Sequence, residues 1–176
     1  MKVVFGFTLI ELLVAIALVA ILVSIGVPSY SYIVTSNRTI AENNKLLDDL
    51  QYARSEAIKE GSYVTICASS NGTSCSGSTA WQNGWIIYSD PNHSGSMDSS
   101  TQILRIQQAF SATDTFVANN NLSSLSFNRE GFPLGLTSAI TFSLHDNTNN
   151  SSFTHCVLIS IVGQMSVKSY LTGVCT

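Results

Sequence analysis

The chain has 176 residues, of which 11% are charged and 45% hydrophobic, with a formal net charge of −3 and a mean hydropathy of +0.25. This length suits about one domain, and the composition is too apolar for a disordered chain. The negative net charge argues against a broadly basic nucleic-acid-binding protein. The charges are unevenly spread: residues 1–36 carry two charged side chains, residues 37–60 carry nine and the remainder carries eight.

The first predicted element is an apolar helix. Residues 7–27 read FTLIELLVAIALVAILVSIGV, with one charged side chain among 21 residues. About 20 apolar residues span a ~30 Å hydrocarbon core as a helix, so this segment is long enough to cross a membrane. Lys2 precedes it, and because positive residues stay cytoplasmic, we expect the remaining chain on the periplasmic or outer side. An ordinary cleaved signal peptide is the alternative, although its A-x-A sequence at 15–17 lies inside the apolar run.

Glu11 interrupts this apolar segment near its start. A carboxylate inside a membrane helix costs about 2.5–3.5 kcal/mol on insertion scales, so it is a functional hypothesis by default; a protonated acid near the interface is the plain alternative. The surrounding residues, GFTLIE after a short leader, resemble the class III signal of type IV pilins and pseudopilins. In that family a prepilin peptidase cleaves after the glycine and methylates the new N-terminal Phe, and the Glu pairs with a neighbouring subunit's N-terminal amine. The resemblance implies cleavage between Gly6 and Phe7, methylation of Phe7 and an assembly role for Glu11.

A second helical segment follows the apolar one. Pro28 is position 22 counted from Phe7, where pilins commonly have a helix-kinking proline. Beyond it, apolar side chains recur at helical spacing and charged ones are assigned to other faces. The apolar set is Ile40, Leu47, Leu50, Ala53 and Ala57, and the charged set is Glu42, Lys45, Asp49, Glu56 and Lys59. We expect the helix to end near Gly61, which makes residues 7–60 one nearly continuous helix of about 80 Å. A separate amphipathic helix on an ordinary anchored domain is the alternative.

Residues 61–176 are predicted to form a β-rich domain. Short apolar runs there are separated by Gly, Asn, Ser and Asp, as hairpin connections require. Seven strands are expected, at residues 63–68, 85–89, 103–108, 122–128, 139–144, 155–161 and 165–170. The predicted fold class is therefore α+β: a type IV pilin-like long N-terminal helix, with its first half in the membrane, packed on a C-terminal antiparallel sheet.

The resemblance narrows in residues 52–90. This segment looks like the FimT/FimU, GspH-like minor pilins, because it contains ARSEAIK, a strand cysteine, a Gly/Ser loop, Trp81 and the Gly-Trp pair ending in Trp85. Later in the chain, FNREG and two further cysteines continue the match. We expect both tryptophans to pack in the core and help fasten the sheet to the helix rather than to form a ligand platform. Gly131 is expected to mark a turn with positive φ.

Four cysteines allow three pairings, and an exported domain can keep them oxidised. The pairing between sequence neighbours is our expectation and joins Cys67 to Cys75 and Cys156 to Cys175; the other two pairings stay open. Zinc binding is the alternative use of these thiols, but the chain has no C-x-x-C pair. Its three histidines also lack ligand-like spacing: they are His93, His145 and His155. We therefore expect no metal and no cofactor.

No catalytic arrangement of residues is recognisable in the domain. It has no phosphate-binding Gly-Lys-Ser/Thr loop, and no motif joins a serine, a histidine and an acid. Asp90, Asp98 and Asp114 lie in polar segments and are expected in solvated turns. The chain is therefore interpreted as a protein that is not an enzyme.

The leading hypothesis from the sequence is a structural minor pilin that helps to initiate type IV pilus assembly and joins the fibre near its tip. The expected organisation is a cleaved leader (1–6), a transmembrane half-helix (7–28), an amphipathic half-helix (29–60) and a disulfide-bonded domain (61–176). The expected partners are other minor and major pilins, the prepilin peptidase, the pilus assembly platform and the inner membrane. The protein is expected to begin as a single-pass inner-membrane protein with a periplasmic domain and to end in the extracellular pilus.

Two other functions stay open. FimT-like relatives bind DNA through a C-terminal Gly-Arg-x-Arg motif, which corresponds here to GQMSVK at 163–168, without either arginine. Residues 61–176 have three basic side chains against five acidic ones, so nucleic acid is a disfavoured partner and Lys168 and Arg129 are weak DNA-contact candidates. The second alternative is a GspH-like pseudopilin of type II secretion; the cysteine pairs and Pro28 favour a pilus.

Overall fold

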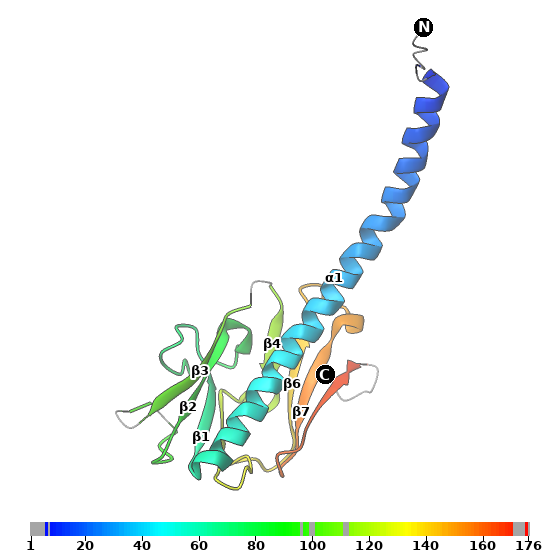
Figure 1. The fold of residues 1–176 in the computed structure, drawn as a ribbon. Helices are drawn as coiled ribbons and strands as arrows, with labels where there is room; N and C mark the ends of the chain where they lie inside the picture. The colour runs from blue at the N-terminus through cyan, green and yellow to red at the C-terminus, as the bar shows by residue number, and fades with distance from the viewer. Residues whose placement is uncertain are drawn as a thin grey trace. The chain divides into compact units, whose positions relative to one another are not determined.

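The computed structural model describes residues 6, 8–95, 97–98, 101–110, 113–170 and 175. The chain divides into two compact units, Met1–Asn37 and Arg38–Thr176, and one helix, α1 (Leu9–Glu60), belongs to both. The described part of the second unit adds eight strands and three short 3-10 helices (Figure 1). The strands are β1 (Val64–Ala68), β2 (Gly84–Ser89), β3 (Gln102–Gln108), β4 (Thr115–Ala118), β5 (Ser124–Phe127), β6 (Ile140–His145), β7 (His155–Ile159) and β8 (Met165–Ser169). The 3-10 helices are η1 (Trp81–Asn83), η2 (Asn119–Asn121) and η3 (Ser151–Phe153).

α1 runs as one helix through both of the halves expected from the sequence. Pro28 lies inside it, although a proline supplies no amide hydrogen to the helical ladder. Ser31 Oγ donates a hydrogen bond to the carbonyl of Pro28 at 2.9 Å, and Ser24 Oγ donates to the carbonyl of Ile21 at 2.7 Å. The alternative of a separate amphipathic helix is therefore wrong, while a kink at Pro28 stays a prediction.

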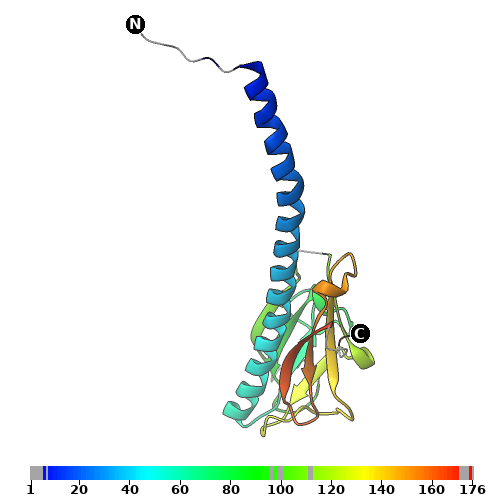
Figure 2. The ribbon, with the colours of Figure 1, turned by 90° about the vertical axis from the view of Figure 1, so that its right-hand side faces the viewer.

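The domain contains two antiparallel sheets rather than the single sheet expected. Their strand orders are β3-β2-β1-β5 and β4-β6-β7-β8, and both lie beside the last part of α1 (Figures 1 and 2). The chain leaves the first sheet after β3, pairs β4 with β6, and returns with β5 to the edge of β1. The sequence analysis missed β4, which has only four residues and alternates exposed and buried side chains. The α+β pilin-like fold class itself is confirmed.

The buried face of α1 differs in part from the expected stripe. Leu50, Ala53 and Ala57 are fully buried as expected, but Ile40 is 40% exposed and Leu46 is buried. Two carboxylates assigned to the outer faces, Glu42 and Asp49, are buried as well, with exposures of 8% and 1%. Charge alone does not mark the solvent side, because Asp49 meets Trp85 and Arg105 of the first sheet and Glu42 lies beside Arg38 and Asp114.

Aromatic rings fill the space between α1 and the sheets. Trp81 and Trp85 are buried, which confirms the expectation that they pack in the core. The ring of Trp81 meets that of Phe142 edge-on at a centroid distance of 5.0 Å, and Trp85 meets Phe116 in the same way at 6.5 Å. Such edge-to-face pairs add about 0.5–1.5 kcal/mol each beyond the area they bury. The Trp81 indole also donates to the carbonyl of Leu122 at 2.9 Å.

Two glycines shape the turns that the sequence pointed to. Gly61 follows the last helical residue with a φ of +62°, and its neighbour Ser62 donates its amide hydrogen to the carbonyl of Ala57. Gly131 has a φ of +80°, as expected, and closes the turn between β5 and β6. A side chain at either position would be strained, because L-residues rarely adopt this conformation.

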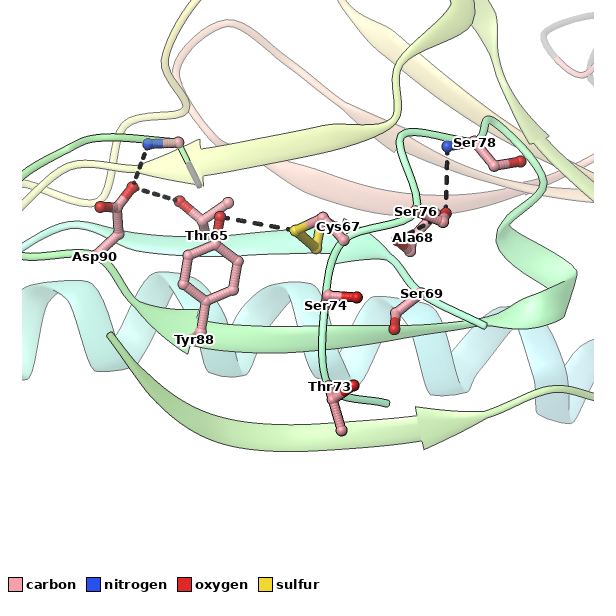
Figure 3. Close-up of a disulfide and its surroundings, with 12 residues drawn as sticks. Thr65, Cys67, Ala68, Ser69, Thr73, Ser74, Ser76, Ser78, Tyr88 and Asp90 are labelled. Carbon is pink, nitrogen blue, oxygen red and sulfur yellow. Dashed lines mark hydrogen bonds between the residues drawn. A yellow bond between two sulfur atoms is a disulfide. The ribbon is translucent and has the colours of Figure 1, made fainter. Parts of the chain in front are cut away.

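Both disulfides join the sequence neighbours named above. Cys67 in β1 is bonded to Cys75 in the loop that leads to η1 (Figure 3), and Cys156 in β7 is bonded to Cys175. The first bond lies in a small cluster of buried side chains on β1 and β2, with the hydroxyl of Tyr88 3.8 Å from the sulfur of Cys75. Each bond therefore fastens a loop or terminal segment to a core strand.

Candidate functional site

The first turn of α1 holds the residues expected to act in assembly. Thr8 caps the helix: its Oγ1 accepts a hydrogen bond from the amide of Glu11 at 3.3 Å, and its carbonyl accepts from the amide of Leu12 at 3.2 Å. TLIE thus begins the helix as a Thr-x-x-Glu capping sequence, and the negative charge of Glu11 lies at the positive end of the helix dipole. Gly6 has nothing within 4 Å of the position of a Cβ atom, whereas Phe7 lies outside the described residues.

The apolar part of α1 leaves its side chains uncovered. Among the described residues, α1 is the one helix long and apolar enough to cross a membrane by length and composition. Leu9, Ile16 and Ile25 have exposed fractions of 78%, 55% and 67%, and the other large apolar residues of this stretch are similarly exposed. Because these residues cover the whole circumference of the helix, it requires apolar surroundings such as a bilayer or other apolar helices.

A cluster of charged side chains fixes α1 to the second sheet close to the junction of the two units. Arg38 Nε and Nη2 donate to the two carboxylate oxygens of Asp114 at 3.0 and 2.9 Å, and the Asp114 side chain is fully buried. Burial and the nearby charge of Asp114 raise the pKa of Glu42 to about 7. The expectation that Asp114 lies in a solvated turn is therefore wrong, because it is the partner of a helix arginine.

A second polar attachment lies near the middle of the docked helix. Asp49 Oδ2 accepts a hydrogen bond from the indole Nε1 of Trp85 at 2.9 Å, and its Oδ1 accepts from Lys45 and Arg105 at 3.0 and 3.1 Å. The guanidinium of Arg105 also lies 3.5 Å from the ring centroid of Tyr52. Sequence reasoning missed this attachment, although one signal existed: a buried tryptophan needs an acceptor for its N–H.

Asp90 is a buried structural residue rather than the expected solvated one. Its carboxylate accepts hydrogen bonds from the amides of Ser94 and Gly95, each at 2.9 Å, and from the hydroxyl of Thr65 at 3.4 Å (Figure 3). These bonds hold the start of the loop after β2 against β1. The described residues contain no group of three or more His, Cys, Asp and Glu side chains that could hold a metal ion.

The DNA-contact candidates lie in two different segments, Arg129 after β5 and Lys168 in β8. Residues 163–168 are a turn followed by edge strand β8 rather than an exposed loop. Lys168 is the fourth residue of β8. Arg129 lies in the turn after β5 with its Nε 3.6 Å from Glu130, and the third basic residue of this region, Arg105, is held by Asp49. Two of these three cations are therefore already beside a carboxylate of the domain.

Comparison with known proteins places these features in a family. Residues 42–163 match the family described as type II transport protein GspH, and residues 1–27 match the prokaryotic N-terminal methylation motif. The chain belongs to the GspH family. The matched N-terminal segment of this GspH-family chain includes Gly6, Phe7 and Glu11, whose individual roles stay predictions.

Solved structures with a similar fold are minor pilins and a minor pseudopilin. The type IV minor pilin FimU of Pseudomonas aeruginosa, in one crystal form, has 25% identity and a TM-score of 0.61, covering 75% of this chain and 89% of FimU. A second crystal form of FimU has 24% identity and a TM-score of 0.58, covering 73% of this chain and 90% of FimU. EpsH, a minor pseudopilin of the Vibrio cholerae type 2 secretion system, has 10% identity and a TM-score of 0.53, covering 75% of this chain and 97% of EpsH. No curated protein sequence matches the chain.

These findings confirm the resemblance to GspH-like minor pilins and the type of protein that was expected. The family and the fold are those of pilin and pseudopilin structural subunits, which are not enzymes and which interact with other pilins. The apolar helix and the methylation motif fit a membrane-anchored protein with a periplasmic domain.

Proposed function

We propose that this GspH-family chain is a type IV minor pilin that is cleaved after Gly6, methylated at Phe7 and built into the fibre through Glu11. Glu11 is the observation that carries the proposal: it is the one charged side chain in the exposed apolar part of α1, next to the leader motif. A carboxylate in apolar surroundings gains most from a cationic partner. The new amine of a neighbouring Phe7 supplies such a partner, and pairing is possible only when subunits lie side by side.

A pilus is favoured over a secretion pseudopilus by the two kinds of structural neighbour. FimU is the more similar, with a TM-score of 0.61 against 0.53 for EpsH. In the proposed sequence of events the prepilin peptidase processes the chain at the inner membrane, the domain stands in the periplasm, and the assembly platform inserts the subunit with other minor and major pilins. As a minor pilin, the chain helps to start the fibre and stays near its tip. Nothing in the described surface favours DNA binding.

The test replaces Glu11 by Ala in the full-length chain expressed in piliated cells. Membrane insertion and leader cleavage should persist, because the apolar segment and Gly6 are unchanged, while the amount of this subunit in sheared fibres should fall at least about tenfold, which corresponds to ~1.4 kcal/mol of lost interaction. Intact-mass measurement of the processed protein should show a methylated Phe7 at its start.

Glu56→Ala is the matched control, since it removes a carboxylate from the same helix outside the apolar segment, where Glu56 pairs with Lys59. It should leave incorporation unchanged. Undiminished incorporation of the Glu11 variant, or a mature protein that starts at another residue, would contradict the proposal.

A further inference from the structure

Exposed apolar side chains gather at the end of the domain where α1 finishes. Four of them are each about half exposed and form what we call the distal patch; they are Ile58 (50%), Phe132 (45%), Ile161 (54%) and Val162 (54%). They come from the last turns of α1, the turn after β5 and the turn between β7 and β8. Figures 1 and 2 both show the end of α1 and the β7–β8 turn at the same end of the domain.

Contacts around Arg54 bring these three segments together in one surface. Its Nη1 donates a hydrogen bond to the carbonyl of Gly163 at 2.7 Å. A Cβ atom on Gly131 would lie 2.7 Å from Cδ1 of Ile58, and one on Gly163 would lie 2.9 Å from the carbonyl oxygen of Gly131. Beside these contacts lies an open groove of about 590 Å³, whose lining includes Gln51, Ser55, Ile58, Val162, Gln164 and Met165.

The β7–β8 turn holds its apolar residues outward in a fixed conformation. The amide of Gly163 donates to the carbonyl of Ser160 at 2.9 Å, and the amide of Gln164 donates to the hydroxyl of Ser160 at 3.0 Å. Ile161 and Val162 therefore occupy the corner of a tight turn, a place where Gly, Asn, Asp and Ser are favoured for their backbone and hydrogen-bonding properties. β-branched aliphatic residues have no such advantage there, and their exposure to water is unfavourable until another surface covers them.

The turn after β5 is preorganised in the same way. The side-chain oxygen of Asn128 accepts hydrogen bonds from the amides of Glu130 and Phe132 at 3.1 and 2.8 Å. Phe132 is thus presented on a rigid turn next to Ile58. A surface whose backbone is already fixed loses little conformational entropy when a partner docks on it.

The place of the patch in the domain indicates what covers it. Arg38, where the domain meets the anchor-bearing unit, lies 20 residues before Ile58 in the same helix, about 30 Å along its axis. In a fibre of subunits whose anchoring helices all point the same way, the end of a domain away from its anchor faces the next subunit, a head-to-tail contact. The patch is at that end.

The chemistry of the patch fits a protein surface rather than a nucleic acid. The guanidinium of Arg54 is already bonded to Gly163, and in the turn that carries Phe132 the exposed Arg129 lies 3.6 Å from the carboxylate of Glu130. The groove adds neutral side chains, Gln51, Ser55 and Gln164, to the aliphatic ones. This combination suits an aliphatic side chain flanked by backbone amides, as another pilin domain can present.

From these observations we infer that the distal patch is the docking surface for the globular domain of the pilin subunit that lies next toward the fibre tip. The inference rests on the proposed function, because it requires that the chain enters a fibre. It adds a specific contact surface, made by Ile58, Phe132, Ile161 and Val162, that is independent of Glu11 and of the apolar helix.

The test places a photo-crosslinking phenylalanine derivative at Val162 in the full-length chain in piliated cells. Illumination should join it to the globular domain of another protein that carries a prepilin leader, as identified by mass spectrometry of the crosslinked peptides. The same probe at Ile106, which is 49% exposed on edge strand β3, is the control and should give no such product. Products with nucleic acid, lipid or proteins that are not pilins, or no product from Val162 in fibres that contain the subunit, would overturn the inference.

A pair of substitutions gives an independent measurement. Ile161→Ser with Val162→Ser should leave the thermal unfolding of the chain nearly unchanged, because both side chains are half exposed, and should lower its amount in sheared fibres by about tenfold. Ile106→Ser should leave that amount unchanged. Wild-type incorporation of the double variant would refute the distal patch, whereas absence of the unmodified chain from fibres would refute the proposed function.

Discussion

Glu42 shows how the environment of a single side chain can make the domain sensitive to pH. It lies on the buried face of α1, its Oε2 has no hydrogen-bond partner among the described residues, and Asp114 is beside it. Burial and that second carboxylate favour the protonated form, which explains a pKa of about 7 instead of 4.5. Arg38 opposes the shift but is already engaged by Asp114.

We expect Glu42→Gln to stabilise the domain at pH 8 and to have little effect at pH 4. Because the pKa of Glu42 is higher in the folded state, folding takes up a proton between about pH 4.5 and 7, and the wild-type free energy of unfolding falls as the pH rises through this range. The full shift corresponds to about 3 kcal/mol at most. Thermal unfolding of a fragment from Thr35 onward, measured at several pH values, checks this.

The difference in stability between the wild type and the Glu42→Gln variant, followed over pH, separates the effect of Glu42 from that of other titratable groups. Burial lowers the pKa of His155, so the stability contributed by that histidine changes with pH in the opposite direction, and it does so in both proteins. Parallel pH profiles for the wild type and the Gln variant would show that Glu42 is not responsible.

At the scale of elements, polar contacts position α1 on the sheets as much as apolar packing does. Asp49 connects α1 to β2 through Trp85 and to β3 through Arg105. Lys45 and Arg105 are each more than 40% exposed and can return to water, but the indole N–H of Trp85 is buried and has no such alternative. The contact with Trp85 is therefore the one whose loss matters for stability.

Asp49→Ala should lower the free energy of unfolding by about 1–3 kcal/mol, the cost of leaving a buried donor unsatisfied. In a Trp85→Phe background, which has no indole N–H, the same change should cost clearly less. A double-mutant cycle from urea unfolding gives the coupling between the two side chains. A coupling near zero would mean that the Asp49–Trp85 hydrogen bond does not stabilise the domain.

The disulfides should differ in their contribution to stability. They close loops of 8 and 19 residues, and in the loop-entropy model the longer one contributes more, by about 0.8 kcal/mol. Replacing Cys156 and Cys175 by Ser should therefore destabilise the domain more than replacing Cys67 and Cys75. Non-reducing peptide mapping should first show both pairs and no free thiol; a link from Cys67 to Cys156 or Cys175 would disprove the connectivity.

The elements that sequence patterns predicted well are those with a local signal. The helix end at Gly61 follows from backbone conformation, and most strands follow from alternation between turn residues. Strand β4 and the second sheet could not be predicted, since a four-residue strand gains its stability from pairing with β6, far along the chain. The same holds for Glu42, Asp49, Asp90 and Asp114, whose burial depends on partners that only the fold brings near.

At the scale of the whole molecule, the distribution of charge limits the kinds of partner that the protein can bind. The sequence has 8 basic and 11 acidic side chains. In the domain Arg38, Arg54 and Arg105 are each bound to a carboxylate or carbonyl of a neighbouring element. Cations used in this way hold the fold together and add little to a surface potential. Family membership therefore indicates the type of protein better than any charged surface does.

The purified domain should bind duplex DNA weakly at about 150 mM salt, near physiological ionic strength, because few phosphates can be neutralised at once. Any residual binding should fall steeply as salt is added. A titration monitored by fluorescence anisotropy measures both. Binding at micromolar concentrations or tighter, abolished by Lys168→Ala and Arg129→Ala, would promote DNA uptake to the leading function.

The three arginine and aspartate attachments of α1 also have a mechanical consequence. Arg38, Asp49 and Arg54 are spaced over 16 residues of one helix, about 24 Å along its axis. Each binds a different segment of the domain: Asp114 before β4, Trp85 in β2 and Gly163 between β7 and β8. A pulling force that enters through the helix acts along this axis and loads all three attachments and the apolar interface in shear. They must then rupture together rather than peel apart one after another, so a domain held in this way can bear tension that its modest individual bonds could not.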